Sequence, residues 1–132
     1  MLYFRKTPGW LKKLFPQAIW NFDDNEKKIF LTFDDGPIPE LTPWVLDTLK
    51  EFSARATFFY VGNNIKKHPE LFKRASDEGH SIGNHTFNHL KGWRNSHEDY
   101  MANIALCEKV IVECGAGDPA RLFRPPYGQL TF

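Results

Sequence analysis

Two adjacent carboxylates, Asp34 and Asp35, are the side chains best suited to chemistry in this 132-residue chain. They follow the apolar run Ile29–Phe33, whose composition is typical of a strand buried on both faces. In α/β folds, ligands gather at the carboxyl ends of such strands. Because neighbouring carboxylates repel, a cation bound by one of them would leave the other free to act as a base. The Gly-Pro that follows also favours a plain tight turn, which is the alternative.

Two histidines separated by three residues, His85 and His89, follow a later predicted strand over 80–84. If the intervening turn is helical, their Cβ atoms lie about 5–6 Å apart on one face. Both imidazoles can then reach one ion, and with a carboxylate they make three ligands and an open position, a pattern typical of catalytic zinc. Two surface histidines beside a turn are the alternative.

Arg124 ends a short predicted strand over 122–124 and precedes Pro125 and Pro126. A guanidinium at a strand end can hold a carboxylate in a fixed orientation through paired N–H donors. The stiff Pro-Pro backbone can in turn aim a backbone N–H at an oxyanion. A surface arginine before a proline-rich turn is the alternative.

The elements that must position these residues alternate along the chain. Strands are predicted over 29–33, 56–62, 80–84 and 122–124, and helices over 42–52, 64–78 and 96–114. Thr42 and Ser96 are expected N-caps, with Asp99 at the capping-box position after Ser96. Strands alternating with helices predict βαβ units, a parallel sheet and the α/β class.

Composition places the chain in the globular class, with 42% hydrophobic and 25% charged residues and room for one domain. A net charge of +1 gives no field that would recruit nucleic acid, so no nucleic-acid partner is expected. Cys107 and Cys114 lie about 10 Å apart along a predicted helix, too far for a disulfide, and we expect both in the core.

The first part of the chain, 1–27, is predicted to be an arm that precedes a domain over 28–132. Lys12 and Lys13 stand among apolar residues, so a membrane-touching turn is one interpretation. We favour an arm packed across its own domain. No signal peptide or membrane-spanning segment is seen, and the default expectation is a cytoplasmic protein.

The three motifs occur together in an order and at separations that resemble a known family. They resemble the first three motifs of the polysaccharide deacetylases, also called the NodB-homology domain or carbohydrate esterase family 4. The stretches that carry the resemblance are Thr32–Gly36, His85–His89 and Arg124–Gly128, with Ala56–Phe59 and Gly79–His85 similar to the family's connecting strands. The resemblance implies a distorted (β/α) barrel, of which this chain carries about the first half.

The resemblance also implies roles. Asp34 would be the general base, Arg124 would orient it, and Tyr127 would offer its backbone N–H to the oxyanion. Thr86 would steady the loop that bears the histidines. A divalent metal, most often zinc but cobalt or another ion in some members, would be bound by Asp35, His85 and His89.

The activity implied is removal of N-acetyl groups from N-acetylglucosamine-containing polysaccharide or oligosaccharide, such as chitin or peptidoglycan. The metal would polarise the amide carbonyl and activate water while Asp34 takes a proton. A non-catalytic remnant that binds glycan or metal, and a relative that hydrolyses other amides or acetyl esters, are the alternatives. Trp44 and Trp93 either stack on sugar rings or pack in the domain.

The sequence departs from the family pattern after Gly128. The later family motifs supply an Asp that holds the arginine and a Leu-x-His that supplies the general acid, and the chain stops at Phe132 before them. We therefore expect this chain alone to be an incomplete domain without measurable deacetylase activity. We also expect an unpaired sheet edge that is open to self-association.

Overall fold

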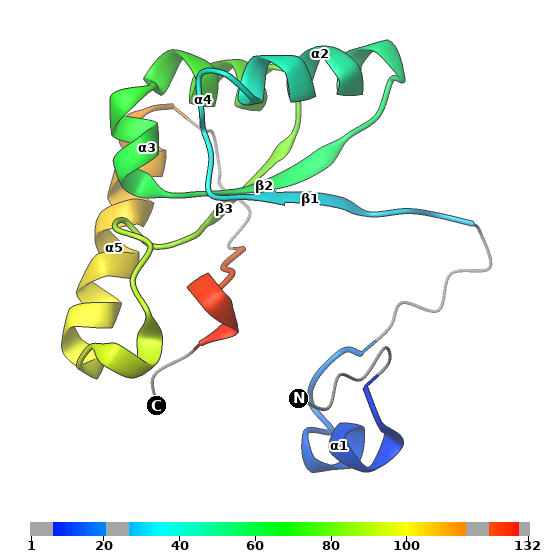
Figure 1. Cartoon of the computed structure of the whole chain (residues 1–132), viewed down its shortest axis with the longest axis vertical. Coiled ribbons are helices and arrows are strands. Elements are labelled where there is room, and N and C mark those ends of the chain that lie inside the picture. The colour runs from blue at the N-terminus through cyan, green and yellow to red at the C-terminus, as the bar shows by residue number, and fades with distance from the viewer. Residues whose placement is uncertain (1–6, 21–26, 116–121, 130–132) are drawn as a thin grey trace.

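A parallel sheet of three strands forms the centre of the fold (Figure 1). The computed structural model describes residues 7–20, 27–115 and 122–129. The strands are β1 (Leu31–Asp34), β2 (Ala56–Tyr60) and β3 (Ser81–Asn84), in that spatial order. The register places Phe33 beside Phe58 and Phe58 beside Ile82. The predicted α/β class with a parallel sheet is confirmed.

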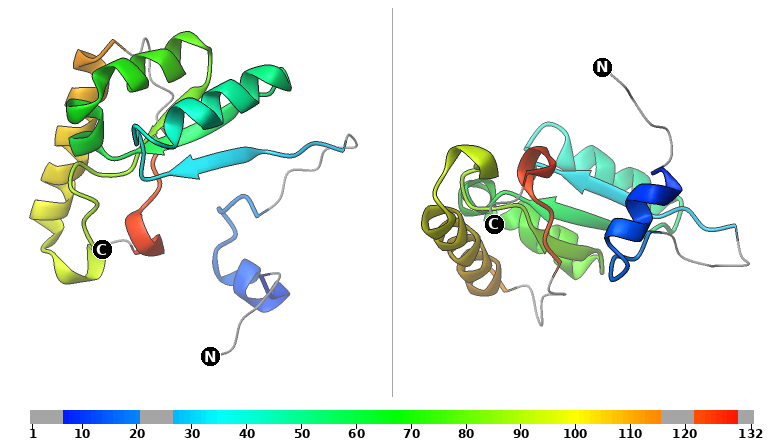
Figure 2. Two further views of the ribbon diagram at one scale, coloured as in Figure 1. Left: turned by 45° about the horizontal axis from the view of Figure 1, so that its top comes forward. Right: turned by 90° about the horizontal axis from the view of Figure 1, so that it is seen from below.

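Helices connect the strands and cover one face of the sheet, as Figures 1 and 2 show. The long helices are α2 (Thr42–Glu51), α4 (Pro69–Asp77) and α5 (His97–Glu113). The shorter ones are α1 (Gly9–Leu14), α3 (Gly62–Lys67) and the 3-10 turns η1 (Gly92–Arg94) and η2 (Pro126–Gly128). A helical connection after β1 and after β2 returns the chain to the amino end of the sheet, so the next strand runs parallel to the one before it. The carboxyl ends of all three strands therefore lie together.

The core lies between β2, β3 and the helices on that face. Phe58 stacks between Phe33 and Tyr60, with ring centroids 5.2 Å apart on each side. Cys107 is buried and Cys114 packs against the cluster, and both are free thiols as expected. The other buried members are Val45, Leu46, Leu49, Ala56, Ile65, Phe72, Ala75, Ile82, Val110 and Ile111. This packing fixes the ends of β2 and β3.

The predicted burial of the first strand is wrong. Ile29 is 86% exposed, Phe30 67% and Leu31 39%, and ladder pairing begins only at Leu31. Among the described strands, β1 pairs with β2 alone, so it is an edge strand with one unpaired side. Residues 29–33 therefore have the composition of a buried strand, but among the described residues they lack the neighbouring elements that would bury them.

Two other predicted elements differ in detail. The single helix over 64–78 is two helices, because Pro69 cannot continue the hydrogen-bond ladder and starts α4 after a break at His68. The strand over 122–124 is reduced to one parallel bridge between Phe123 and Asn84, since Pro125 ends the pairing. Thr42 is the first helical residue and not the cap, and its hydroxyl accepts the Ile38 N–H at 2.8 Å.

The described part of the N-terminal arm does not pack across the domain, contrary to our expectation. Trp10, Leu14, Phe15 and Ile19 are all more than half exposed, and α1 stands apart from the sheet in Figure 1 and in the left view of Figure 2. A helix of six residues makes under two turns and cannot present a long apolar face. Residues 1–6 and 21–26 of the predicted arm lie outside the described residues. Within the described chain no helix is long and apolar enough to cross a membrane.

Candidate metal and catalytic site

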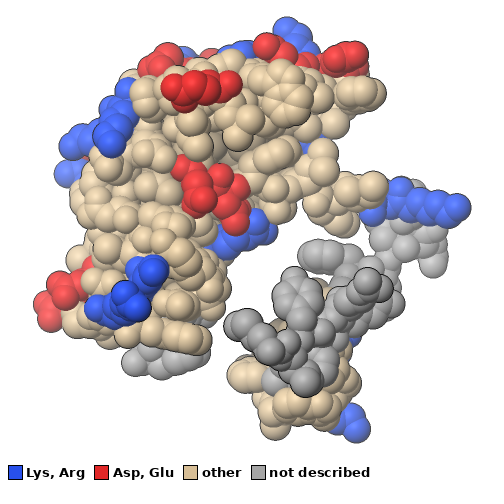
Figure 3. Space-filling view, viewed as in Figure 1, with Lys and Arg blue, Asp and Glu red and all other residues tan. Residues whose placement is uncertain are grey.

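The carboxylate pair leaves the carboxyl end of β1 in two different conformations. Asp34 is the last strand residue, whereas Asp35 adopts a left-handed backbone with φ of 72°. Asn64 at the start of α3 donates its side-chain amide to the Asp35 carbonyl at 2.7 Å and holds this turn. The reversal at Asp35 lets neighbouring carboxylates serve different partners. Figure 3 shows acidic side chains gathered on the exposed face near this strand end, with basic side chains beside them.

Asp35, His85 and His89 converge on one point. Asp35 Oδ1 lies 3.0 Å from His89 Nε2 and 3.4 Å from His85 Nε2, and the three ligand atoms all lie within 4.8 Å of one another. The His85 side chain is 4% exposed, while that of Asp35 is 59% exposed, so the cluster opens to solvent on the aspartate side. Two imidazole nitrogens and one carboxylate with an open side are a donor set that suits a divalent metal.

The protonation of His85 fits a metal ligand. Its Nδ1 lies 2.7 Å from the Arg124 carbonyl, which can only accept, so Nδ1 carries the proton and Nε2 presents a lone pair toward Asp35. Burial lowers the pKa of His85, chiefly by desolvating the charged ring. A neutral imidazole with its second nitrogen held by a carbonyl is the form that binds metal, so the residues present fit the ion that the motif predicts.

The turn between the two histidines is not helical, so the condition on which we based their common face is not met. Residues 85–89 form an irregular bend in which Thr86 and His89 have positive φ values of 63° and 55°. These two reversals, and not an i,i+4 helix face, bring the imidazoles to a ring separation of 5.0 Å. The two imidazoles therefore lie side by side without the helical turn that the sequence argument assumed.

Three side chains hold this bend, and one of them was predicted. Thr86 is fully buried and its hydroxyl accepts the Leu90 N–H at 3.2 Å, as the steadying role requires. Asn84 Oδ1 accepts the Thr86 N–H at 2.9 Å. Asn103 Oδ1 accepts the next two backbone N–H groups at 2.8 and 2.9 Å. Asn103 lies on the buried side of α5, and a polar residue in that apolar stripe is a signal that sequence reasoning missed.

Arg124 contacts Asp34 as the sequence predicted. Its Nη1 donates to Asp34 Oδ1 at 2.7 Å and to Thr32 Oγ1 at 3.0 Å. The guanidinium carbon also lies 4.1 Å from the centroid of the Phe59 ring, a cation–π distance. Thr32 and Phe59, which were not predicted as site residues, therefore position the arginine from two neighbouring strands.

Tyr127 lies against the cluster formed by Asp35, His85 and His89. Its backbone is left-handed with φ of 57°, and its ring centroid lies 4.8 Å from that of His89. Lys91 Nζ lies 4.7 Å from the centroid of the same ring. The ring is largely exposed, so it can contact a bound substrate. Trp44 and Trp93 are likewise exposed at 64% and 74%, and their stacking on sugars stays a prediction.

All six predicted site residues line one cavity. It has a volume of about 380 Å³, which is within the range of small-molecule sites. Its lining consists of Asp34, Asp35, His85, His89, Arg124, Pro125, Tyr127 and Gly128. A paired carboxylate and arginine thus stand beside a three-ligand cluster in a space that can admit part of a sugar.

Comparison with known proteins agrees with this arrangement. The sequence profile of the family described as polysaccharide deacetylase matches residues 22–131. The chain belongs to the polysaccharide deacetylase family. The match includes every residue of the site.

Several deacetylases are similar to this chain. A peptidoglycan-N-acetylglucosamine deacetylase of Bacillus cereus is 46% identical over 112 residues, which cover 85% of this chain and 52% of the relative. A chitooligosaccharide deacetylase of Azorhizobium caulinodans is 42% identical over 79% of this chain and 50% of its own length. The solved structure of peptidoglycan deacetylase PdaC from Bacillus subtilis superposes with a TM-score of 0.76 at 39% identity, covering 80% of this chain and 52% of that one.

The chain spans about half the length of the curated relatives that it matches. Its solved neighbours are carbohydrate-esterase-type deacetylases, and the three-stranded sheet corresponds to part of their fold.

Proposed function

We propose that this deacetylase-family chain serves the metal-dependent hydrolysis of N-acetyl groups on N-acetylglucosamine-containing polysaccharide, of the peptidoglycan or chitin kind. The observation that carries the proposal is the division of labour between two adjacent carboxylates. Asp35 faces two imidazoles, whereas Asp34 faces Arg124 in the same cavity. Relatives that act on peptidoglycan and on chitooligosaccharide support the substrate class.

Asp35, His85 and His89 would hold the ion, which we propose to be zinc. Imidazole and carboxylate ligands with an open position suit zinc, and cobalt is the alternative that the family allows. When bound, the ion would supply Lewis-acid polarisation of the amide carbonyl and a lowered pKa for water.

Asp34 is the base in this proposal. Arg124 occupies its Oδ1 at 2.7 Å, so we assign Oδ2 to take the proton of the attacking water. Phe59 and Thr32 restrain the guanidinium, and this restraint keeps the carboxylate oriented before substrate arrives. Tyr127, turned by its left-handed backbone at the rim of the cavity, would present its N–H to the oxyanion of the tetrahedral intermediate.

Departure of the sugar amine requires a proton. The described lining of the cavity contains no histidine or carboxylic acid beyond those already assigned. We propose that the general acid comes from a segment outside the described residues, as the length of the relatives allows. A missing positioned acid would lower turnover by about 10²–10⁴-fold.

The proposal is tested by acetate release from chitooligosaccharide and from peptidoglycan, with zinc or cobalt added. The chain is assayed alone and joined after Gly128 to the carboxyl-terminal half of the Bacillus cereus relative. We expect turnover in the joined protein and its near-complete loss in the Asp34→Asn variant, with metal content unchanged. Equal turnover in the Asp34→Asn variant, or loss of metal from it, would contradict the assignment of the two carboxylates.

A further inference from the structure

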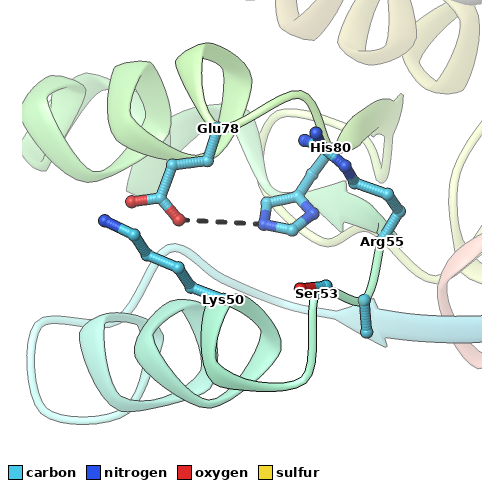
Figure 4. Close-up of a pocket in the computed structure, with 6 residues that line it drawn as sticks. Lys50, Ser53, Arg55, Glu78 and His80 are labelled. Carbon is cyan, nitrogen blue, oxygen red and sulfur yellow. Dashed lines mark ion pairs between the residues drawn. The ribbon is translucent and has the colours of Figure 1, made fainter.

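A second cavity lies at the opposite end of the sheet, where β2 and β3 begin (Figure 4). Its volume is about 330 Å³, far larger than one water molecule needs. Its lining comes from the end of α2, the start of β2 and the connection between α4 and β3. The lining residues are Lys50, Ser53, Ala54, Arg55, Glu78 and His80.

His80 is buried at this cavity with one nitrogen unsatisfied. Its side chain is 3% exposed, and its ring packs edge-on against Phe58 at 5.3 Å. Nδ1 accepts the Ala56 N–H at 3.4 Å, so in the neutral ring Nε2 carries the proton. Nε2 is buried and has no hydrogen-bond partner among the described residues. Glu78 Oε2, joined to it by the dashed line in Figure 4, is 4.0 Å away and too distant for a hydrogen bond.

The charges around His80 leave a positive excess. Within the described residues, neither Lys50 nor Arg55 has a carboxylate partner, although both line the cavity. Glu78 is the acidic lining residue, and its Oε1 receives Arg74 Nε at 2.8 Å. The Glu78 carboxylate is thus already paired, while Lys50, Arg55 and the buried N–H of His80 line the same cavity.

The helix ends do not take up these donors. At the end of α2, the carbonyl of Leu49 accepts the Ala54 N–H at 2.8 Å, and that of Lys50 accepts the Ser53 N–H at 3.0 Å. At the end of α4, the Ala75 carbonyl receives the His80 N–H at 3.2 Å. These carbonyls accept backbone N–H groups, and within the described residues the Lys50 and Arg55 side chains make no hydrogen bond to them.

We infer that this cavity binds a small soluble oxyanion, a carboxylate or a phosphate, through His80 Nε2–H and the Lys50 and Arg55 side chains. An acceptor-only ligand with negative charge complements two unpaired cations and an unpaired donor, and charge-assisted hydrogen bonds are the stronger kind. Burial lowers the pKa of His80, so the ring stays neutral and donates through Nε2 near pH 7. The cavity shares no lining residue with the one that contains Asp35, His85 and His89, and the inference does not depend on the proposed deacetylation.

The test uses the 132-residue chain, with inorganic phosphate and acetate as probes and chloride at matched ionic strength as the reference. Imidazole nitrogen NMR reports on His80, whose signal is assigned by its loss in His80→Asn. That variant places an amide oxygen near the position of Nδ1 and keeps the acceptor for Ala56. We expect a saturable shift of the His80 Nε2 signal with phosphate or acetate and none with chloride.

Lys50→Met removes one cation and keeps the apolar stem. We expect this substitution to lower the affinity for phosphate or acetate by about tenfold, because one charge-assisted contact is lost. Lys73→Met is the matched control, because Lys73 lies on α4, pairs with Asp77 at 2.9 Å and does not line the cavity. Phosphate acting alone would identify a phosphate site, and acetate acting alone a carboxylate site. Equal affinities in the two methionine variants, or a shift that chloride reproduces, would overturn the inference and leave a hydrated cavity.

Discussion

Left-handed backbone conformations have different roles at the carboxyl end and at the amino end of the sheet. Five residues other than glycine have positive φ values among the described residues, and four of them, Asp35, Thr86, His89 and Tyr127, lie at the carboxyl end. At the amino end Ser53 is the single case, and it occupies a helix-capping position that glycine usually fills. Strain at the carboxyl end aims side chains at one cavity, whereas strain at the amino end closes a helix. In this chain, the unusual backbone conformations that support a functional site are the four that converge on one cavity.

The two ends also differ in polar satisfaction. The buried polar side chains Asn84, His85 and Thr86 at the carboxyl end have partners at 2.7–3.2 Å. Each end also keeps a buried polar atom without a hydrogen-bond partner among the described residues, Tyr60 Oη at the carboxyl end of β2 and His80 Nε2 at the amino end of β3. The difference is that the side chains of the His85–His89 bend are held by protein partners, whereas the buried ring of His80 is held on one side only.

The largest effect is expected from the metal ligands. His85→Ala and His89→Ala each remove one of three donors, so zinc affinity should fall by more than the 10–100-fold that loss of an outer-shell partner costs. Calorimetric zinc titration of the chain measures this. His68→Ala, a histidine at the break between α3 and α4, is the control and should bind zinc as wild type does. Unchanged affinity in the His85 and His89 variants would place the site elsewhere.

Gly83→Ala should disturb the carboxyl end through packing. A Cβ at Gly83 would lie 2.5 Å from Phe59 Cδ1, so the ring that supports Arg124 must move. Overpacking of this kind lowers the free energy of unfolding by about 1–3 kcal/mol, measurable by urea denaturation. Gly9→Ala adds a methyl where nothing lies within 4 Å and should leave the midpoint unchanged. A wild-type midpoint for Gly83→Ala would show that Phe59 adapts freely.

Phe59→Leu should loosen Arg124 while keeping most of the buried volume. Loss of the cation–π contact is expected to cost about 0.5–2 kcal/mol, and the Arg124 Nε–Hε signal in NMR should lose its ring-current shift. Phe59→Tyr keeps the ring and should preserve that signal. A signal insensitive to removal of the ring would mean that Thr32 and Asp34 alone hold the guanidinium.

Two glycine substitutions sharpen the contrast in backbone strain. Ser53→Gly removes left-handed strain from a capping position and should raise the free energy of unfolding by about 0.5–1 kcal/mol. Thr86→Gly relieves the same kind of strain but deletes the hydroxyl that accepts the Leu90 N–H, so it should lower stability. Thermal denaturation of both variants compares the ends directly. Stabilisation by both would remove the distinction that we draw.

The smallest effect concerns pH at the amino end. Burial lowers the pKa of His80 below that of the unfolded chain, about 6.5. The unfolded state therefore binds more protons as pH falls through that value, and the contribution of neutral His80 to stability, full at higher pH, is lost. Urea midpoints from pH 8 to pH 5 should fall more steeply for wild type than for His80→Asn. Parallel curves would assign the pH dependence to other groups.

The sequence was informative about the site because its chemistry is local. The pairs Asp34–Asp35 and His85–His89 and the strand-end Arg124 each lie beside a β-strand, and parallel strands bring such positions together. The left-handed conformation of Thr86 could not be predicted, because a β-branched residue rarely adopts it. Histidine adopts it more often, but nothing in the sequence marks His89 as such a case. Both conformations depend on Asn103, a partner far along the chain.

The exposure of the first strand was harder to predict from the sequence than the strand itself. The apolar composition of residues 29–33 predicted a strand correctly from Leu31 on, but composition does not specify how many neighbours a strand has. The division at His68 was readable in principle, since Pro69 interrupts the helical pattern. The cavity at His80 left no pattern in the sequence, because its lining comes from three separate segments.

Arg124 serves both halves of the carboxyl-end site through different atoms. Its guanidinium contacts the Asp34 carboxylate, and its carbonyl receives the His85 ring proton. Replacement of the side chain therefore separates the two contacts, since Arg124→Ala keeps the carbonyl. Displacement of the segment does not separate them. A rigid-body shift of this short stretch moves the guanidinium that contacts Asp34 and the carbonyl that contacts His85 in the same direction and by the same distance. Movement of the backbone at Arg124 would therefore disturb the orientation of Asp34 and that of His85 together. Substitution of the Arg124 side chain would disturb Asp34 alone.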